Sequence, residues 1–99
     1  MSSQLSESYK QDLLAIITKY LPVAKVYLFG SRARREQRPG SDIDIALDAG
    51  KQIDAITLMR IKNDIEESKI PVFVDVIDLH NVSDDFKNFI TKDLIPWKN

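Results

Sequence analysis

A glycine–serine turn in the first third of the chain is suited to binding phosphate groups. Gly30 and Ser31 follow an apolar run over 26–29 that predicts a short buried strand. Glycine lets backbone N–H groups approach phosphate oxygens closely, and the start of a following helix favours anions. Ser31 is also a natural helix N-cap, and the two roles are compatible. The turn therefore predicts a phosphate-binding position.

A pair of aspartates follows this turn after ten residues. Asp42 and Asp44 open a second apolar run, and residues two positions apart on a strand point to the same side, with Cα atoms about 6.5–7 Å apart. This spacing suits one divalent cation, or two cations about 3.5–4 Å apart. An isolated Asp-x-Asp is more often a turn or a strand edge. Beside the glycine–serine turn, it indicates chemistry on a metal-bound nucleoside triphosphate.

Strand periodicity identifies a third aspartate. The run over 42–47 alternates aspartate or alanine with isoleucine or leucine, which predicts one polar and one aliphatic face. In the next β-rich run, over 72–79, Val72, Val74 and Val76 supply a matching aliphatic face and leave Asp75 opposite. Adjacent strands lie about 4.8 Å apart, so Asp75 is expected beside the first two carboxylates. Three carboxylates on one face repel each other unless cations neutralise them.

Two nearby aspartates do not meet the same conditions. Asp78 has the opposite parity and stands where the strand ends, so we expect it to begin a turn. Asp48 has the right parity but lies about 13 Å along the strand from Asp44, which puts it out of reach. His80, the single histidine, is predicted to be a surface residue.

The remaining pattern predicts a small α/β domain with three core strands. Helices are expected over 5–21, after Ser31 up to Pro39-Gly40, over 53–65, and from a cap at 83–85 onward, alternating with strands over 26–29, 42–47 and 72–79. Tyr27 and Phe29 are interpreted as core residues. Trp97, in the apolar tail, is a candidate contact with a partner chain.

Bulk composition narrows the class of protein. The 99 residues suit one domain, 1–99, and no apolar run approaches the roughly 18–20 residues that span a bilayer. A net charge of −1 gives no global attraction to nucleic acid, although four arginines against one glutamate over 32–38 give a local charge of +3 beside the turn. The absence of cysteine and of a secretory signal agrees with a cytoplasmic location.

The chain resembles a known family through these motifs. Gly30-Ser31, ten residues, and Asp42-x-Asp44 match the signature of the DNA polymerase β-like nucleotidyltransferases, and the flanking residues resemble their minimal prokaryotic branch. The resemblance implies a polymerase β palm-like fold, a small mixed sheet flanked by helices, over nearly all of the chain. The chain departs from the family at Arg35, where members commonly carry glycine.

The resemblance implies transfer of a nucleoside monophosphate, with ATP as the usual nucleotide and Mg²⁺, or Mn²⁺, as the metal. Asp42, Asp44 and Asp75 are the implied catalytic and metal-binding residues, and Asp75 aligns with the family's third acidic position. The predicted nucleotide-binding residues are Gly30, Ser31, Arg32 and Ser41, the last mainly ordering the turn before Asp42.

The acceptor of the nucleotide is left open by the sequence. The resemblance implies that the acceptor is a hydroxyl group of a HEPN-type helical protein encoded nearby, with which the chain forms a toxin–antitoxin pair and a hetero-oligomer. Any link to nucleic acid would run through that partner. The alternatives are a subunit of a two-component transferase that modifies a small molecule, and a binding module without catalysis. Retention of all three carboxylates argues against the last.

Overall fold

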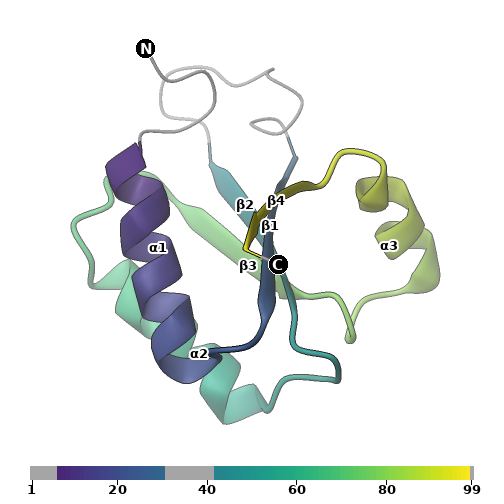
Figure 1. Ribbon diagram of the computed structural model, residues 1–99, viewed down its shortest axis with the longest axis horizontal. Helices are drawn as coiled ribbons and strands as arrows, with labels where there is room; N and C mark the ends of the chain where they lie inside the picture. Colours follow the sequence, from purple (N-terminus) through teal and green to yellow (C-terminus); the bar gives the residue numbers. More distant parts are fainter. Residues whose placement is uncertain (1–6, 31–41, 99) are drawn as a thin grey trace.

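The computed structural model describes residues 7–30 and 42–98, and they form three helices and one four-stranded sheet (Figure 1). The elements in chain order are α1 (Glu7–Tyr20), β1 (Lys25–Phe29), β2 (Ile43–Asp48), α2 (Ala55–Glu66), β3 (Val74–Asp78), α3 (Asp84–Thr91) and β4 (Ile95–Lys98). The helices and strands predicted for these parts of the chain are confirmed to within a few residues. The helix expected after Ser31 lies outside the described residues.

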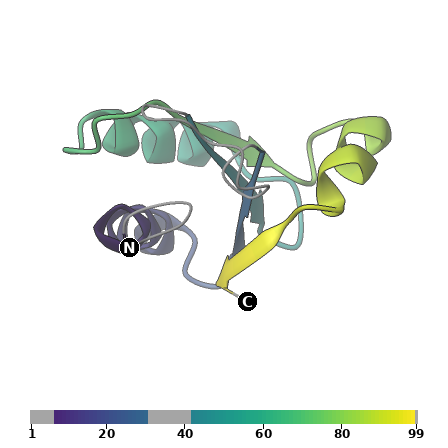
Figure 2. The ribbon, with the colours of Figure 1, turned by 90° about the horizontal axis from the view of Figure 1, so that it is seen from above.

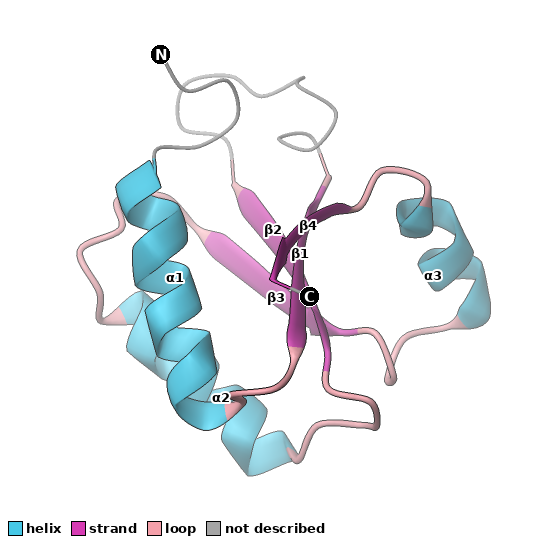
Figure 3. Cartoon of the chain, viewed as in Figure 1, coloured by secondary structure: helices cyan, strands magenta, loops and turns pink. Residues whose placement is uncertain are grey.

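The sheet is mixed, with the strand order β3-β2-β1-β4 (Figure 3). β1 runs antiparallel to both β2 and β4, whereas β2 and β3 are parallel and are joined through α2. The prediction of three strands is wrong, because residues 95–98 add a fourth beside β1. The sequence does not predict this strand, because Pro96 is a residue that strands generally exclude. A proline is nevertheless tolerated there, since β4 is at the edge of the sheet.

One face of the sheet carries the main hydrophobic core. Figure 2 shows α1 and α2 together on this side. The largest fully buried side chains come from α1 and α2 and from the strands β1, β2 and β3: Leu13, Ile17, Val26, Leu28, Ile43, Ile45, Leu47, Ile61 and Val76. The aliphatic parity expected for the second and third strands is therefore confirmed.

The opposite face is covered in part by α3, which Figure 2 shows on the other side of the sheet. A smaller apolar cluster joins Phe29 and Ala46 of the sheet to Leu79 and to Ile90 of α3. The rings of Phe29 and Phe86 meet edge to face, with centroids 6.3 Å apart. Ser83 caps α3 as predicted, because its side chain accepts a hydrogen bond from the backbone N–H of Phe86.

The tail is tied to the body of the molecule rather than exposed. Trp97 is half-buried against the main core, and the ammonium of Lys10 lies over its ring, 5.8 Å from the centroid. The Lys98 ammonium donates to the carbonyl oxygens of Pro22 and Ala24, at 2.8 and 3.1 Å.

None of the helices in residues 7–30 and 42–98 is both long and apolar enough to cross a membrane.

Candidate active site

Strand register brings three of the predicted site residues together. Asp44 on β2 is the Cα partner of Phe29 on one side and of Asp75 on the other. Because Gly30 directly follows Phe29, this glycine lies just past the end of β1, beside the aspartates on β2 and β3. Asp44 and Asp75 lie on the face of the sheet that carries α3, opposite the main core. The predicted parity of Asp75 is confirmed.

Gly30 is required at its position for two reasons. Its backbone φ is +78°, a left-handed conformation that glycine adopts without steric cost. A Cβ placed there would also stand 2.2 Å from the carboxylate Oδ2 of Asp44, far inside contact distance. The absence of a side chain therefore lets the backbone of Gly30 lie directly against the Asp44 carboxylate.

The carboxylates suit a magnesium ion that is completed by phosphate oxygens. Asp42 is exposed one position before β2, Asp44 is half-buried and Asp75 is exposed. Within residues 7–30 and 42–98, no three acidic or histidine side chains converge as the ligands of one ion. Mg²⁺ commonly binds through one or two carboxylates and takes its other ligands from substrate phosphates and water. The donor set fits such an ion.

Several predicted nucleotide-binding residues lie outside the described part of the chain. Ser31, Arg32 and Ser41 belong to this group, as do Arg35 and the remaining arginines of the basic segment over 32–38.

Asp78 has a structural position, as its parity predicted. Its side chain is 3% exposed, and its two oxygens accept hydrogen bonds from the backbone N–H groups of Ile53, at 2.7 Å, and His80, at 2.9 Å. The second bond forms the predicted turn at the end of β3. The first fixes the segment that leads into α2, since Ile53 lies just before the N-cap Asp54 rather than inside the helix.

Asp48 and His80 form a separate pair at the far end of β2. Asp48 Oδ1 accepts from the Gly50 N–H at 2.9 Å and lies 2.7 Å from His80 Nε2. These two interactions hold the pKa of Asp48 below its usual range. His80 is exposed, as predicted, but its ring has this specific partner.

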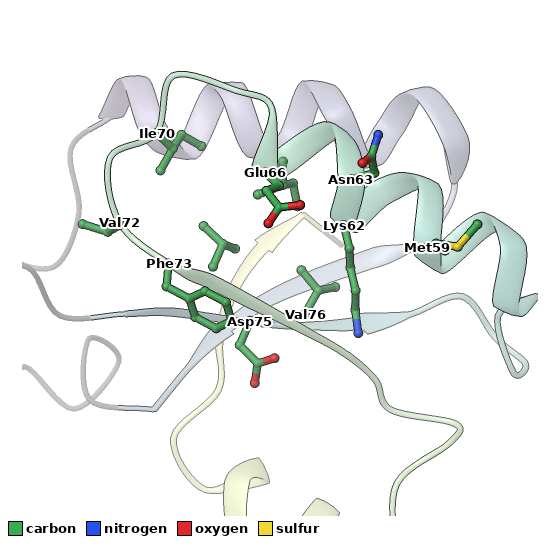
Figure 4. A pocket seen from close by; sticks show the side chains of 11 residues that line it. Met59, Lys62, Asn63, Glu66, Ile70, Val72, Phe73, Asp75 and Val76 are labelled. Carbon is green, nitrogen blue, oxygen red and sulfur yellow. The ribbon is translucent and has the colours of Figure 1, made fainter.

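A groove beside Asp75 was not anticipated from the sequence. It has a volume of about 420 Å³ and lies along β3, with one wall from α2 (Figure 4). We call it the edge groove and define it by Met59, Lys62, Glu66, Phe73, Val74 and Asp75. The available signal was Phe73, an aromatic residue on the face opposite the aliphatic core.

Comparison with known proteins agrees with this arrangement. Residues 11–96 match the family model described as polymerase beta, nucleotidyltransferase. A protein of Haemophilus influenzae named as a probable protein adenylyltransferase, MntA, is 32% identical over 96 residues, which cover 93% of this chain and 84% of the relative.

Two of the solved structures with a similar fold come from toxin–antitoxin pairs. A crystal structure of a toxin–antitoxin with AMP-PNP matches with a TM-score of 0.76 and 25% identity, over 91% of this chain and 73% of that chain. A minimal nucleotidyltransferase antitoxin bound to the tri-AMPylated HEPN toxin of Shewanella oneidensis matches with a TM-score of 0.73 over 96% of this chain and 74% of that chain. At 22% identity, the second likeness establishes the fold alone.

The chain belongs to the polymerase β nucleotidyltransferase family. It is therefore an enzyme of the class that transfers nucleotides. Gly30, Asp44 and Asp75 lie where β1, β2 and β3 are side by side.

Proposed function

We propose that this chain is a protein adenylyltransferase that transfers AMP from ATP to a hydroxyl group of a HEPN-type toxin, and thereby acts as its antitoxin. The observation that carries the proposal is the register that sets Asp44 beside Asp75 on β3 and beside Phe29, the last residue of β1, which Gly30 directly follows. The similarity to MntA supports protein as the acceptor, and the toxin–antitoxin structure with AMP-PNP supports ATP as the nucleotide.

In the proposed reaction, the acceptor oxygen forms a bond to the α-phosphorus of ATP, and the bond to the oxygen that bridges to the β-phosphate breaks. Pyrophosphate leaves, and the hydroxyl proton passes to the carboxylate of Asp75. Backbone N–H groups at Gly30 and Ser31, the Ser31 hydroxyl, and Arg32 hold the outer phosphates, which aligns the α-phosphorus for in-line attack. Ser41 orders the turn that presents Asp42.

In this proposal, Asp42 and Asp44 would hold Mg²⁺, or Mn²⁺, on the triphosphate, and Asp75 would bind the metal ion nearer the acceptor. The metal would supply charge neutralisation on the triphosphate and would lower the pKa of the attacking hydroxyl. The donor chemistry supports this assignment, because aspartate oxygens are ligands that Mg²⁺ prefers. We further propose that residues 1–99 work as one domain in the cytoplasm, where ATP and Mg²⁺ are present, in a hetero-oligomer with the toxin.

The proposal is tested by following radiolabel from α-labelled ATP. The purified chain is mixed with Mg²⁺ and the HEPN-type protein encoded beside it, and labelled protein is resolved by electrophoresis. We expect covalent label on the HEPN-type protein, and little turnover of ATP without it. Label only on an added small hydroxylated molecule would favour the two-component transferase. A tight complex without transfer, which the Asp42→Asn/Asp44→Asn variant reproduces, would favour a binding module.

Divalent metal is expected to raise the melting temperature of the wild-type chain in the presence of a non-hydrolysable ATP analogue. Binding to the folded state alone stabilises it by about 1.4 kcal/mol at ten times Kd. The Asp42→Asn/Asp44→Asn variant should lose this metal-dependent increase. The charge-matched variant Asp84→Asn/Asp85→Asn, on the exposed start of α3, should keep it. A wild-type melting curve indifferent to millimolar Mg²⁺ and Mn²⁺ would contradict the site.

Replacing Gly30 with alanine is expected to lower transfer at least about tenfold, because the new Cβ displaces the Asp44 carboxylate. Gly50→Ala is the matched control. Gly50 has a similar φ, +82°, but a Cβ there would meet nothing within 4 Å. Both variants should lose about 1–2 kcal/mol of stability from backbone strain, and only Gly30→Ala should lose activity. Equal activity in the two variants would show that the close contact is unimportant.

A further inference from the structure

The outer edge of β3 has hydrogen-bonding groups that no other strand in residues 7–30 and 42–98 uses. The strand order places β3 at an edge of the sheet, with β2 as its neighbour on one side only among the described residues. Phe73 O accepts from Ile43 N, and Leu79 N donates to Leu47 O, both at 2.9 Å. In a parallel pair the groups facing one neighbour belong to alternate residues, so Val74 and Val76 direct their N–H and C=O groups to the open edge.

The side chains beside this edge are unusually apolar for an exposed surface. Phe73 is 66% exposed just before β3, and Met59 is 61% exposed on α2. Both line the edge groove, which Figure 4 shows between α2 and the strand. Unpaired backbone groups next to exposed apolar side chains form a surface that an extended peptide can bind by adding a strand.

We propose that the edge groove binds an extended segment of the acceptor protein as an additional strand next to β3. This proposal rests on the proposed function, since it assigns the place where that acceptor docks. Asp75 lines the groove and is also a site carboxylate. A residue of the added strand opposite Asp75 projects from the same face of the sheet, which brings a hydroxyl group on that segment to the candidate active site.

Charge favours a different protein over a second copy of this chain. Two copies of β3 could pair antiparallel, and the register in which Val74 and Val76 exchange hydrogen bonds with their counterparts sets Asp75 opposite Asp75. Like charges directly opposite each other destabilise a strand pair. Glu66 adds a second negative charge to the groove against the one positive charge of Lys62. The groove therefore suits a segment with a basic residue near the acceptor hydroxyl.

Amide hydrogen exchange, measured by NMR on the full chain with and without the HEPN-type protein encoded beside it, tests this proposal. In the free chain, the amides of Val74 and Val76 should exchange quickly, and those of Asp75 and Ile77 should be protected by β2. In the complex, Val74 and Val76 should become protected at least about tenfold. Transfer of label while both amides exchange as in the free chain would overturn the proposal, as would failure to form any complex.

Two variants test the docking energy separately from the chemistry. Val74→Pro removes a single outward N–H at the first residue of an edge strand, where proline is tolerated. Phe73→Lys removes the exposed ring and adds charge. Each should raise the Kd for the HEPN-type protein at least about tenfold, the change that a loss of about 1.4 kcal/mol of binding free energy produces. Affinity for the ATP analogue should stay unchanged, and the effect on transfer should fall on KM rather than on kcat.

Val23→Lys is the matched control, because Val23 is 86% exposed in the turn between α1 and β1, at the opposite end of the sheet from Gly30. It should bind the HEPN-type protein as wild type does. Unchanged binding by both groove variants would overturn the proposal, as would protection of Val74 and Val76 by self-association of the free chain. Amide protection and weakened binding without any transfer of label would instead support the docking site and reject the proposed reaction.

Discussion

Replacing Asp75 with asparagine is expected to lower nucleotide transfer at least about a hundredfold, the usual contribution of a general base. The melting temperature without metal or nucleotide should stay close to wild type, because Asp75 is exposed on an edge strand. The measurement is kcat with labelled ATP and the protein acceptor, together with a thermal melt. Asp48→Asn is the control, since Asp48 lies on the neighbouring strand at the other end of the site face. Near-normal transfer by Asp75→Asn would reject the proton-acceptor role.

Replacing Asp78 with alanine is expected to destabilise the fold, whereas replacing Asp75 is expected to slow nucleotide transfer. It leaves the N–H of Ile53 without the buried acceptor that now lies 2.7 Å away, and it also removes the bond to His80. An unsatisfied buried donor costs about 1–3 kcal/mol, and a domain of this size loses about 4–8 °C of melting temperature per kcal/mol. We therefore expect a melting temperature lower by about 4–24 °C.

Activity per folded molecule should change little in Asp78→Ala when it is assayed well below its melting temperature. Asp78→Asn keeps one acceptor oxygen and should be less destabilised. If Asp78 proved essential for chemistry in a variant that melts like wild type, its assignment as a structural residue would be wrong.

Strand parity could be predicted from the sequence because the side-chain period of a strand is fixed at two. In each of the two strands, the aliphatic side chains next to Asp44 or Asp75 all lie on one face of the strand. Only one register buries both aliphatic faces against the helices. The same constraint separated Asp75 from Asp78, which is buried and hydrogen-bonded as the turn assignment required.

The fourth strand could not be predicted in the same way. Its four residues include Pro96, and neither alternation nor β-branched content marks the segment. Residues 95–98 become a strand because β1 offers an unpaired edge beside them and Trp97 packs against the main core. Both causes are contacts with distant parts of the chain, and the local β-propensity of residues 95–98 does not reflect them.

The edge groove was missed for a related reason. The sequence places Phe73 and Asp75 on one face but does not say that β3 is the last strand on its side, nor that α2 stands beside it. The spacing of Ile53 fits the helical stripe and predicts that this residue belongs to the helix. It lies before the cap instead, since Asp78 binds its N–H from a distant part of the chain.

The pairing of β1 with β4 has a consequence for the order of folding. β1 is synthesised well before its outer neighbour, which comes from residues 95–98. Until that segment arrives, one side of β1 is an open edge that can pair with other chains. Such late, non-local closure slows folding relative to a helical protein of similar size. A newly made chain is therefore most exposed to aggregation in the interval before its last strand docks.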